Sequence, residues 1–156
     1  MTRSLKLAEK TEARAVPRLT RRSLPMALLR AREAVMARFR PLLAEHDVTE
    51  QQWRVIRILG ESGTLDATEL ASRCCILTPS LTRMIRALAQ RKLITRRKNA
   101  EDGRRLILDV TPKAHAMIAS MMPEINAVYE ALENEFGKDR LEGVLDVLED
   151  LADIES

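Results

Sequence analysis

The fold is decided by the stretch LDATELASRCCILTPSLTRMIRALAQRKLITRRKNAEDGRRLILDV, residues 65–110. It divides into a short helical pattern, a brief turn, a second helical pattern with a basic outer face, and two strand-like runs around a charged tip. The second helical pattern is the most informative part, because its periodicity separates apolar from polar side chains. Its phase therefore predicts which side chains pack and which face outward.

This second helix is predicted to begin at Thr78-Pro79-Ser80. The Thr78 hydroxyl is expected to cap the helix. Pro79 is expected at the first helical position, where its missing N–H costs nothing because an N–H there has no partner within the helix. Arg83 and Arg86 either solvate a surface helix or bind an anionic partner. At 3.6 residues per turn, the predicted buried face holds Leu81, Met84, Ile85 and Leu88, and the outer face holds Pro79, Thr82, Arg83, Arg86 and Gln90.

The flanking segments complete the pattern. Upstream, Asp66 can cap a helix with Glu69 as its third residue, a capping-box-like pair. Downstream, residues 94–98 and 105–110 predict two strands joined by an Asp-Gly turn with Arg104 near its tip. The buried side of the upstream helix is predicted to hold Leu70, Ala71 and Cys74. The whole stretch predicts a winged helix-turn-helix, a mainly α fold with a small β-hairpin wing.

Charge is distributed unevenly along the chain. Residues 1–22 carry seven basic and two acidic side chains, residues 23–82 seven of each, residues 83–105 nine and two, and residues 106–156 three and twelve, which gives +5, 0, +7 and −9. The predicted second helix and wing therefore concentrate positive charge in one place. Such a patch attracts nucleic-acid phosphate whatever the base sequence.

These residues resemble a known family. The order of LASRCCILTPSLTRMIRALAQRKLITR followed by a hairpin with DGRR is similar to the MarR family of winged-helix repressors, and Asp102-x-Arg104 matches that family's wing signature. Three further segments resemble the branch of homoprotocatechuate and other aromatic-acid catabolic operon repressors: RAREAVMARFRPLL at 30–43, VTEQQWRVIRIL at 48–59 and CILTPSLTRM at 75–84. The resemblance extends from about Leu24 to the C-terminus.

The resemblance and the helix phase together predict how double-stranded DNA is bound. A homodimer with two-fold symmetry would recognise an inverted repeat. We expect Ser80, Thr82, Arg83 and Arg86 to enter the major groove, and Thr78 with Ser80 to donate to phosphate. The resemblance implies that Arg104 enters the minor groove with Asp102 as its support. Lys98 and Arg105 are expected to contact phosphate.

The expected organisation is one domain behind a basic arm. Residues 1–22 are polar and predict a flexible basic N-terminal arm. Residues 23–156 predict a single MarR-like domain, with a DNA-binding lobe at about 48–110 and dimerisation helices at about 23–46 and 111–155. Those helices are predicted to begin near Ser23, at Thr111-Pro112 and at Lys138, with the last running to Glu155. Thr49 and Gln52 predict a capping box, with Trp53, Ile56 and Leu59 on the buried side of its helix.

The first long helix carries candidates for effector binding. Arg32 falls within its apolar stripe and Arg38 on the flank, and a guanidinium there needs an anion or access to water. The anion is either a carboxylate of the partner subunit or a ligand, and the resemblance implies a small aromatic acid. His46 either caps the helix end or joins the effector site, and Trp53 is either a core residue or a pocket wall.

Cys74 and Cys75 leave one alternative open. Adjacent cysteines do not form an ordinary disulfide, and with no nearby histidine they make a poor metal site. They are expected to be small buried residues in the turn between the two helices, and the alternative is a redox-sensing regulator that acts through Cys74 or Cys75.

Other function classes lack support in the sequence. No phosphate-binding glycine loop, metal-ligand spacing or nucleophile elbow is present, so neither an enzyme, a cofactor nor a metal site is expected. A non-specific architectural DNA-binding protein would bind without regard to sequence. The chain lacks an apolar run of about 18 residues and an apolar signal core, which predicts a cytoplasmic protein that does not enter membranes.

Overall fold

The computed structural model describes residues 22–154. The predicted basic arm therefore lies almost entirely outside the described residues. The chain divides between Arg38 and Phe39 into two compact units. The first unit contains the beginning of helix α2, Leu24–Glu45, whose helix start is marked by the Ser23 hydroxyl accepting from the backbone N–H of Met26 at 3.4 Å.

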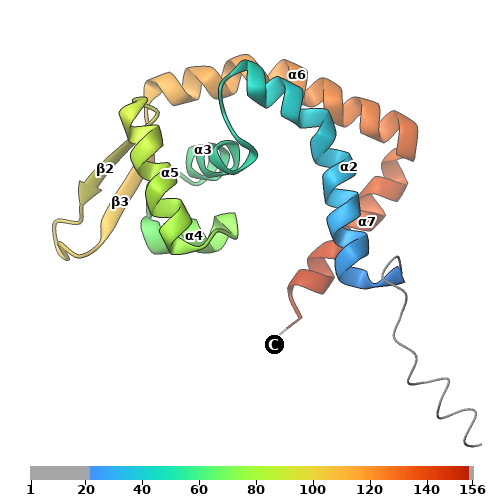
Figure 1. The fold of residues 1–156 in the computed structure, drawn as a ribbon, viewed down its shortest axis with the longest axis horizontal. Coiled ribbons are helices and arrows are strands. Elements are labelled where there is room, and N and C mark those ends of the chain that lie inside the picture. The colour runs from blue at the N-terminus through green and yellow to red at the C-terminus, as the bar shows by residue number, and fades with distance from the viewer. Residues whose placement is uncertain (1–21, 155–156) are drawn as a thin grey trace, which may run out of the picture. The chain divides into compact units, whose positions relative to one another are not determined.

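The second unit holds the end of α2 and the other described elements. They are α3 Glu50–Ser62, β1 Leu65–Asp66, α4 Ala67–Cys74, α5 Thr78–Gln90, β2 Ile94–Lys98, β3 Leu106–Val110, α6 Pro112–Phe136 and α7 Lys138–Ala152 (Figure 1). The fold is mainly α with a small antiparallel sheet, as predicted. The sequence predicted that the last helix runs to Glu155. It ends at Ala152, because Asp153 is its C-cap residue.

The sheet contains one strand that the sequence did not predict. The strand order is β1-β3-β2, with both pairs antiparallel. The predicted hairpin pairs Ile94 with Val110 and Lys98 with Leu106. The two-residue strand β1 joins the other edge of β3 through the pair Leu65 and Leu108. This pairing attaches the wing to the residues that directly precede α4.

Helix starts follow the predicted capping rules in three of the helices. The Thr49 hydroxyl accepts from the N–H of Gln52, whose amide oxygen accepts from the N–H of Thr49, a complete capping box. Thr111 caps α6 by accepting from Ala114, with Pro112 next. Asp66 caps α4 by accepting from Glu69, but the Glu69 carboxylate bonds Arg73 instead of returning to Asp66. The predicted box at Asp66 is therefore only half formed.

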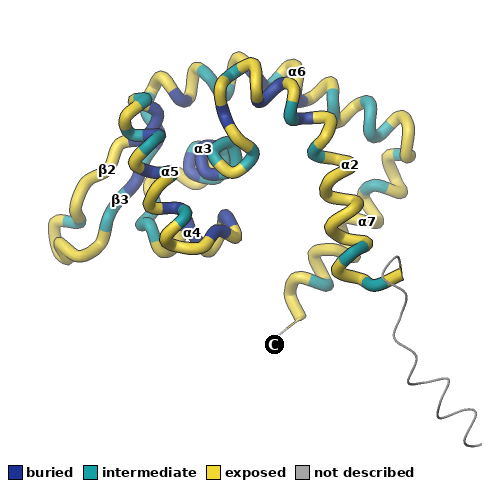
Figure 2. Tube along the Cα trace, in the orientation of Figure 1, coloured by how far each residue is buried: buried dark blue, intermediate teal, exposed yellow. Residues whose placement is uncertain are grey.

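The core lies where α3, α4, α5 and β3 meet, and these elements carry most of the buried segments in Figure 2. In α3 the buried side is Val55, Ile56 and Leu59, whereas Trp53, predicted on that side, is only partly buried. Gly60 lies against α6, because a Cβ there would stand 3.0 Å from Cδ1 of Ile118. The largest fully buried side chains are Leu43, Ile56, Leu59, Leu70, Leu81, Leu88, Leu93, Leu108 and Met121.

The turn between α2 and α3 is held by Arg91, at the end of α5. The Arg91 guanidinium donates to the carbonyl oxygens of Asp47 at 2.6 Å and His46 at 3.4 Å. The sequence offered His46 as the cap of this helix end, but these hydrogen bonds show that Arg91 satisfies carbonyls there. The end of α5 is thereby joined to the end of α2.

The long helices leave apolar surface uncovered. No residue of α7 is buried, and Val144, Leu145 and Leu148 are exposed by 41%, 45% and 38%. On α2, Leu24, Leu28, Leu29 and Val35 are also exposed. Val144, Leu145 and Leu148 occupy neighbouring positions of α7, and clustered exposed apolar residues of this kind mark an interaction site.

Two glycines in the α6–α7 region allow a matched stability test. Gly137 joins the two helices with φ +98°, a conformation that costs a residue with a Cβ about 1–3 kcal/mol. Gly143 lies within α7 with open space around it, where alanine favours helix by about 0.5–1 kcal/mol. We expect urea unfolding to show that Gly137→Ala destabilises the protein and Gly143→Ala stabilises it. Equal effects would contradict the assigned backbone at Gly137.

Candidate DNA-binding surface

Helix α5 separates its side chains as its sequence phase predicted. Leu81, Ile85 and Leu88 are buried, and Met84 is partly buried. On the opposite face, Thr82, Arg83 and Arg86 are exposed, as are Pro79 and Gln90. Burial of one face fixes the rotation of the helix about its axis, so the two arginines must face outward.

The start of α5 differs from the prediction. Leu77, not Thr78, is the N-cap residue, and it makes no side-chain capping hydrogen bond. Thr78 is already helical, since the N–H of Leu81 bonds the carbonyl of Leu77 at 3.0 Å. The Thr78 carbonyl accepts from the Thr82 hydroxyl at 3.0 Å. Thr78 and Ser80 therefore lie in the first helical turn, where backbone N–H groups have no helical acceptor.

The turn between α4 and α5 is held by backbone hydrogen bonds. Cys75 adopts the left-handed conformation, with φ 52° and ψ 47°, and ends α4. The N–H of Cys75 bonds the Ser72 carbonyl and the N–H of Ile76 bonds the Ala71 carbonyl, each at 3.1 Å. From α3, Arg54 donates to the Cys74 carbonyl at 2.9 Å. The turn that sets the angle between α4 and α5 is thus held where it leaves α4.

The wing tip is organised by two polar side chains. The Asn99 side-chain oxygen accepts from the N–H groups of Glu101 and Asp102, at 2.8 and 3.3 Å. The Asp102 carboxylate accepts from the N–H of Arg104 at 3.0 Å. The predicted Asp-Gly signal thus lies in a longer loop, and Gly103 does not need positive φ. Arg104 is exposed beside this turn.

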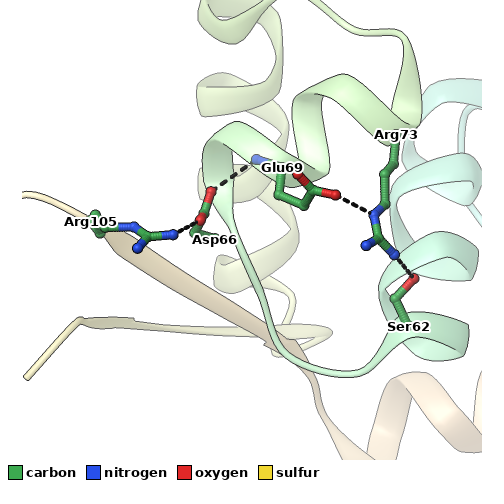
Figure 3. Close-up of polar contacts among 5 residues, drawn as sticks. All are labelled: Ser62, Asp66, Glu69, Arg73 and Arg105. Carbon is green, nitrogen blue, oxygen red and sulfur yellow. Dashed lines mark hydrogen bonds and ion pairs between the residues drawn. The ribbon is translucent and has the colours of Figure 1, made fainter.

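A single carboxylate links the wing to α4 (Figure 3). One oxygen of Asp66 accepts from the N–H of Glu69 at 2.9 Å, and the other accepts from the Arg105 guanidinium. Glu69 in turn pairs with Arg73 at 2.7 Å, and Arg73 donates to the Ser62 hydroxyl at 3.0 Å. The Glu69 N–H, followed by Arg105, holds the pKa of Asp66 below its ordinary value, and Asp66 raises the pKa of Arg105.

Strand β2 contributes cations that the sequence reasoning left without a role. Arg96 and Arg97 are exposed, as is Lys98, which was predicted to contact phosphate. Arg96 pairs with Leu108 and Arg97 with Ile107, so their side chains leave opposite faces of the edge strand. Charged side chains on an edge strand also discourage pairing with another sheet. Arg96 and Arg97 lie close to the wing tip in the sequence, and this proximity could have predicted a role for them in binding.

Comparison with known proteins identifies the family. Residues 48–106 match the sequence profile of the MarR family. The chain is 40% identical over 133 residues to the HTH-type transcriptional regulator FarR of Neisseria gonorrhoeae, an alignment that covers 85% of this chain and 91% of that one. The chain belongs to the MarR family of transcriptional regulators.

Two further relatives confirm the resemblance to the aromatic catabolic branch. The homoprotocatechuate degradative operon repressor of Escherichia coli is 39% identical over 128 residues, covering 82% of this chain and 86% of that one. The crystal structure of NadR in complex with 4-hydroxyphenylacetate is 38% identical and superposes with a TM-score of 0.78 over 90% of this chain and 99% of that one.

Family membership settles the broad class of this protein. The chain is a transcriptional repressor of the MarR family with a winged helix-turn-helix, and it is not an enzyme. None of the helices in residues 22–154 is both long enough and apolar enough to span a bilayer.

The cysteines of this MarR-family protein do not favour the redox alternative. Cys74 is fully buried, and burial raises the pKa of its thiol, which keeps it in the less reactive protonated form. Cys75 is exposed, contrary to the prediction that both cysteines are buried, because its left-handed backbone ends α4. The relatives described above point to the aromatic catabolic branch instead.

The predicted effector residues are divided between the two units. Arg32 and Arg38 lie in the first unit, where Arg32 pairs with Glu33 at 3.2 Å and is 42% exposed. This exposure removes the argument that Arg32 is a buried charge in need of an anion. In the second unit, His46 and Trp53 are both partly buried.

Arg57 is a residue that the sequence reasoning missed. Its guanidinium lies 5.8 Å from the centre of the Trp53 ring, one helical turn away, and donates to the sulfur of Met122 at 3.3 Å. The side chain is 31% exposed and also pairs with Glu61. The spacing of four residues between Trp53 and Arg57 was the available signal, because it places them on one side of α3.

The Asp66–Arg105 pair makes a prediction about pH. Because the pKa of Asp66 is lowered by folding, its charge stabilises the native state above its ordinary pKa of 3.8, and this contribution is lost as pH falls through the folded value. Asn is also a good N-cap residue, so Asp66→Asn removes the charge while retaining the cap. Urea unfolding should show wild type more stable than Asp66→Asn at pH 7, with the difference shrinking below pH 3.8. A difference independent of pH would contradict the charge pairing.

Proposed function

We propose that this protein is a homodimeric repressor that binds an inverted-repeat operator and is released by a small aromatic carboxylic acid. The observation that carries the DNA-binding part is the two-faced α5, which presents Arg83 and Arg86 outward while its other face is buried. Kinship with the homoprotocatechuate repressor and with NadR supports the effector class.

In this proposal each lobe reads DNA through α5 and the wing. Ser80, Thr82, Arg83 and Arg86 enter the major groove, where an arginine that bonds guanine contributes about 1–3 kcal/mol of discrimination. Thr78 and Ser80 donate to phosphate together with the free N–H groups of the first turn. Arg104 enters the minor groove, with its loop held by Asp102, and Lys98 contacts phosphate. Arg105 has further N–H groups beyond the one that bonds Asp66, and these reach phosphate.

The dimer is proposed to form through residues 23–46 and 111–155, leaving residues 48–110 as the DNA-binding lobe. The exposed apolar residues of α2 and α7 support this division, because isolated monomers rarely expose so many apolar side chains. Two-fold symmetry would present the two α5 helices about 34 Å apart, one turn of DNA. An inverted repeat with half-sites at that spacing is the matching operator.

Effector control follows from differential affinity. The candidate contacts for an aromatic acid are Arg32 and Arg38 in the first unit and, separately, His46 and Trp53 in the second. Such an acid releases DNA only if it binds more tightly to a dimer whose two lobes no longer fit one DNA turn. Trp53 supplies an aromatic surface, and Arg57 beside it adds a positive charge in reach of a carboxylate. The hydrogen bonds of Arg91 to the α2–α3 turn provide a route by which movement of α2 reaches α5.

Arg83→Ala tests sequence reading. We expect the variant to lose about 1–3 kcal/mol of binding to the operator and much less to random DNA, because the lost contact is to a base. Lys98→Ala is the matched control and should weaken both complexes alike, with a smaller salt dependence, because its contact is to phosphate. Fluorescence anisotropy on both duplexes gives the two affinities. An equal loss for Arg83→Ala on both would assign Arg83 to phosphate.

Arg32→Ala tests the effector site. The variant should bind the operator as wild type does but respond to an aromatic acid only at much higher concentration. Arg30→Ala, an exposed arginine on the same helix, is the control and should respond normally. Trp53 is the chain's single tryptophan, so its fluorescence reports acid binding directly. If Arg32→Ala instead dissociates the dimer in sedimentation experiments, Arg32 has a structural role.

A further inference from the structure

Leu77 is an anomaly in the proposed DNA-binding lobe. Its side chain is 80% exposed, the highest value among the exposed large hydrophobic residues of the described chain. The others belong to α2, α6 and α7 or follow α7, where a partner subunit can cover them. Within residues 48–110, Leu77 alone of the large hydrophobic residues is exposed in this way.

The position of Leu77 is unfavourable for the helix as well. It is the N-cap of α5, where serine, threonine, aspartate and asparagine are preferred and leucine is among the poorest choices. By sequence spacing Leu77 lies four residues before the buried Leu81, yet its extended backbone, with φ −65° and ψ 139°, takes it out of the helical path. A residue that helps neither the cap nor the core points to a function.

The surroundings of Leu77 are open. Its side chain lines a hollow of about 390 Å³ between α4 and the start of α5. Three residues with a hydroxyl group, Thr68, Ser72 and Thr78, share that lining with Ala71. The backbone that precedes Leu77 is fixed by the burial of Ile76 and by the hydrogen-bonded turn at Cys75. Leu77 is therefore presented on a rigid turn, beside groups that can donate to phosphate.

We propose that Leu77 reads a thymine in each operator half-site through contact with its 5-methyl group. This inference rests on the proposed DNA-binding function. In a helix-turn-helix the N-terminal residues of the second helix contact base edges while the first helix crosses the backbone. The thymine methyl is the apolar group that the major groove offers, so it is the partner that an exposed leucine at this place selects.

The expected effect is modest for one contact and measurable for two. Removing one methyl group from an apolar contact weakens binding about fourfold, and removing it from both half-sites weakens binding about fifteenfold. A duplex with deoxyuridine in place of thymine lacks only that methyl group and keeps the same base pairing. The substitution therefore removes the proposed partner of Leu77 without disturbing the hydrogen bonds that other residues make.

The experiment combines a protein substitution with DNA base replacements in a double-mutant cycle, and fluorescence anisotropy measures the affinity of each pair. Symmetric thymine-to-deoxyuridine replacements are made one position at a time in both half-sites, and each duplex is titrated with wild type and with Leu77→Ala. We expect one position at which deoxyuridine weakens wild type about fifteenfold but leaves Leu77→Ala unchanged. Additive losses at every position would overturn the proposal.

A second variant separates this role from a role in folding. Leu77→Asn supplies a capping side chain and should raise the Tm by about 3–6 °C while losing the same thymine preference as Leu77→Ala. A lower Tm together with the loss of binding would make Leu77 a structural residue. Failure of the proposed function is distinguishable, because wild type would then bind operator and random DNA alike, whereas failure of this inference leaves wild type specific.

Discussion

The winged helix-turn-helix depends on the burial of one face of α5. Leu81, Ile85 and Leu88 are enclosed by the core, and this burial fixes the rotation of a 13-residue helix about its axis. A rotation of half a turn would expose these three side chains and bury Arg83 and Arg86 without partners, at a cost of several kcal/mol for each charge. The outward direction of the arginines is therefore a consequence of core packing.

Polar contacts determine how α4, the wing and the α2–α3 turn are positioned around α5. Asp66 caps α4 with one carboxylate oxygen and binds Arg105 of the wing with the other, so the wing and α4 share one anchor. β1 adds a second attachment by pairing with β3 in the residues just before α4. Arg91 connects the end of α5 to the α2–α3 turn. Each contact joins elements that are distant in sequence, and together they give the binding surface a defined geometry.

Sequence reasoning succeeded where the determining forces are local. The capping of α3 by Thr49 and of α6 by Thr111 and the two faces of α5 follow from residues within a few turns of one another, and the strands of the wing pair through one short loop. It failed where distant residues decide the outcome. The short strand β1 exists because Leu65 meets Leu108, and Arg105 meets Asp66 across 39 positions. The shift of the α5 cap from Thr78 to Leu77 likewise depends on how the preceding turn closes.

The proposed control of DNA binding by an aromatic acid can be tested directly in this MarR-family repressor. The most direct measurement is fluorescence anisotropy of labelled DNA from upstream of its own gene, bound by the intact protein and titrated with hydroxylated and methoxylated benzoic, phenylacetic and cinnamic acids. We expect one or two of these acids to release the DNA at concentrations that leave random DNA binding unchanged. Tight operator binding that none of the acids relieves would contradict it.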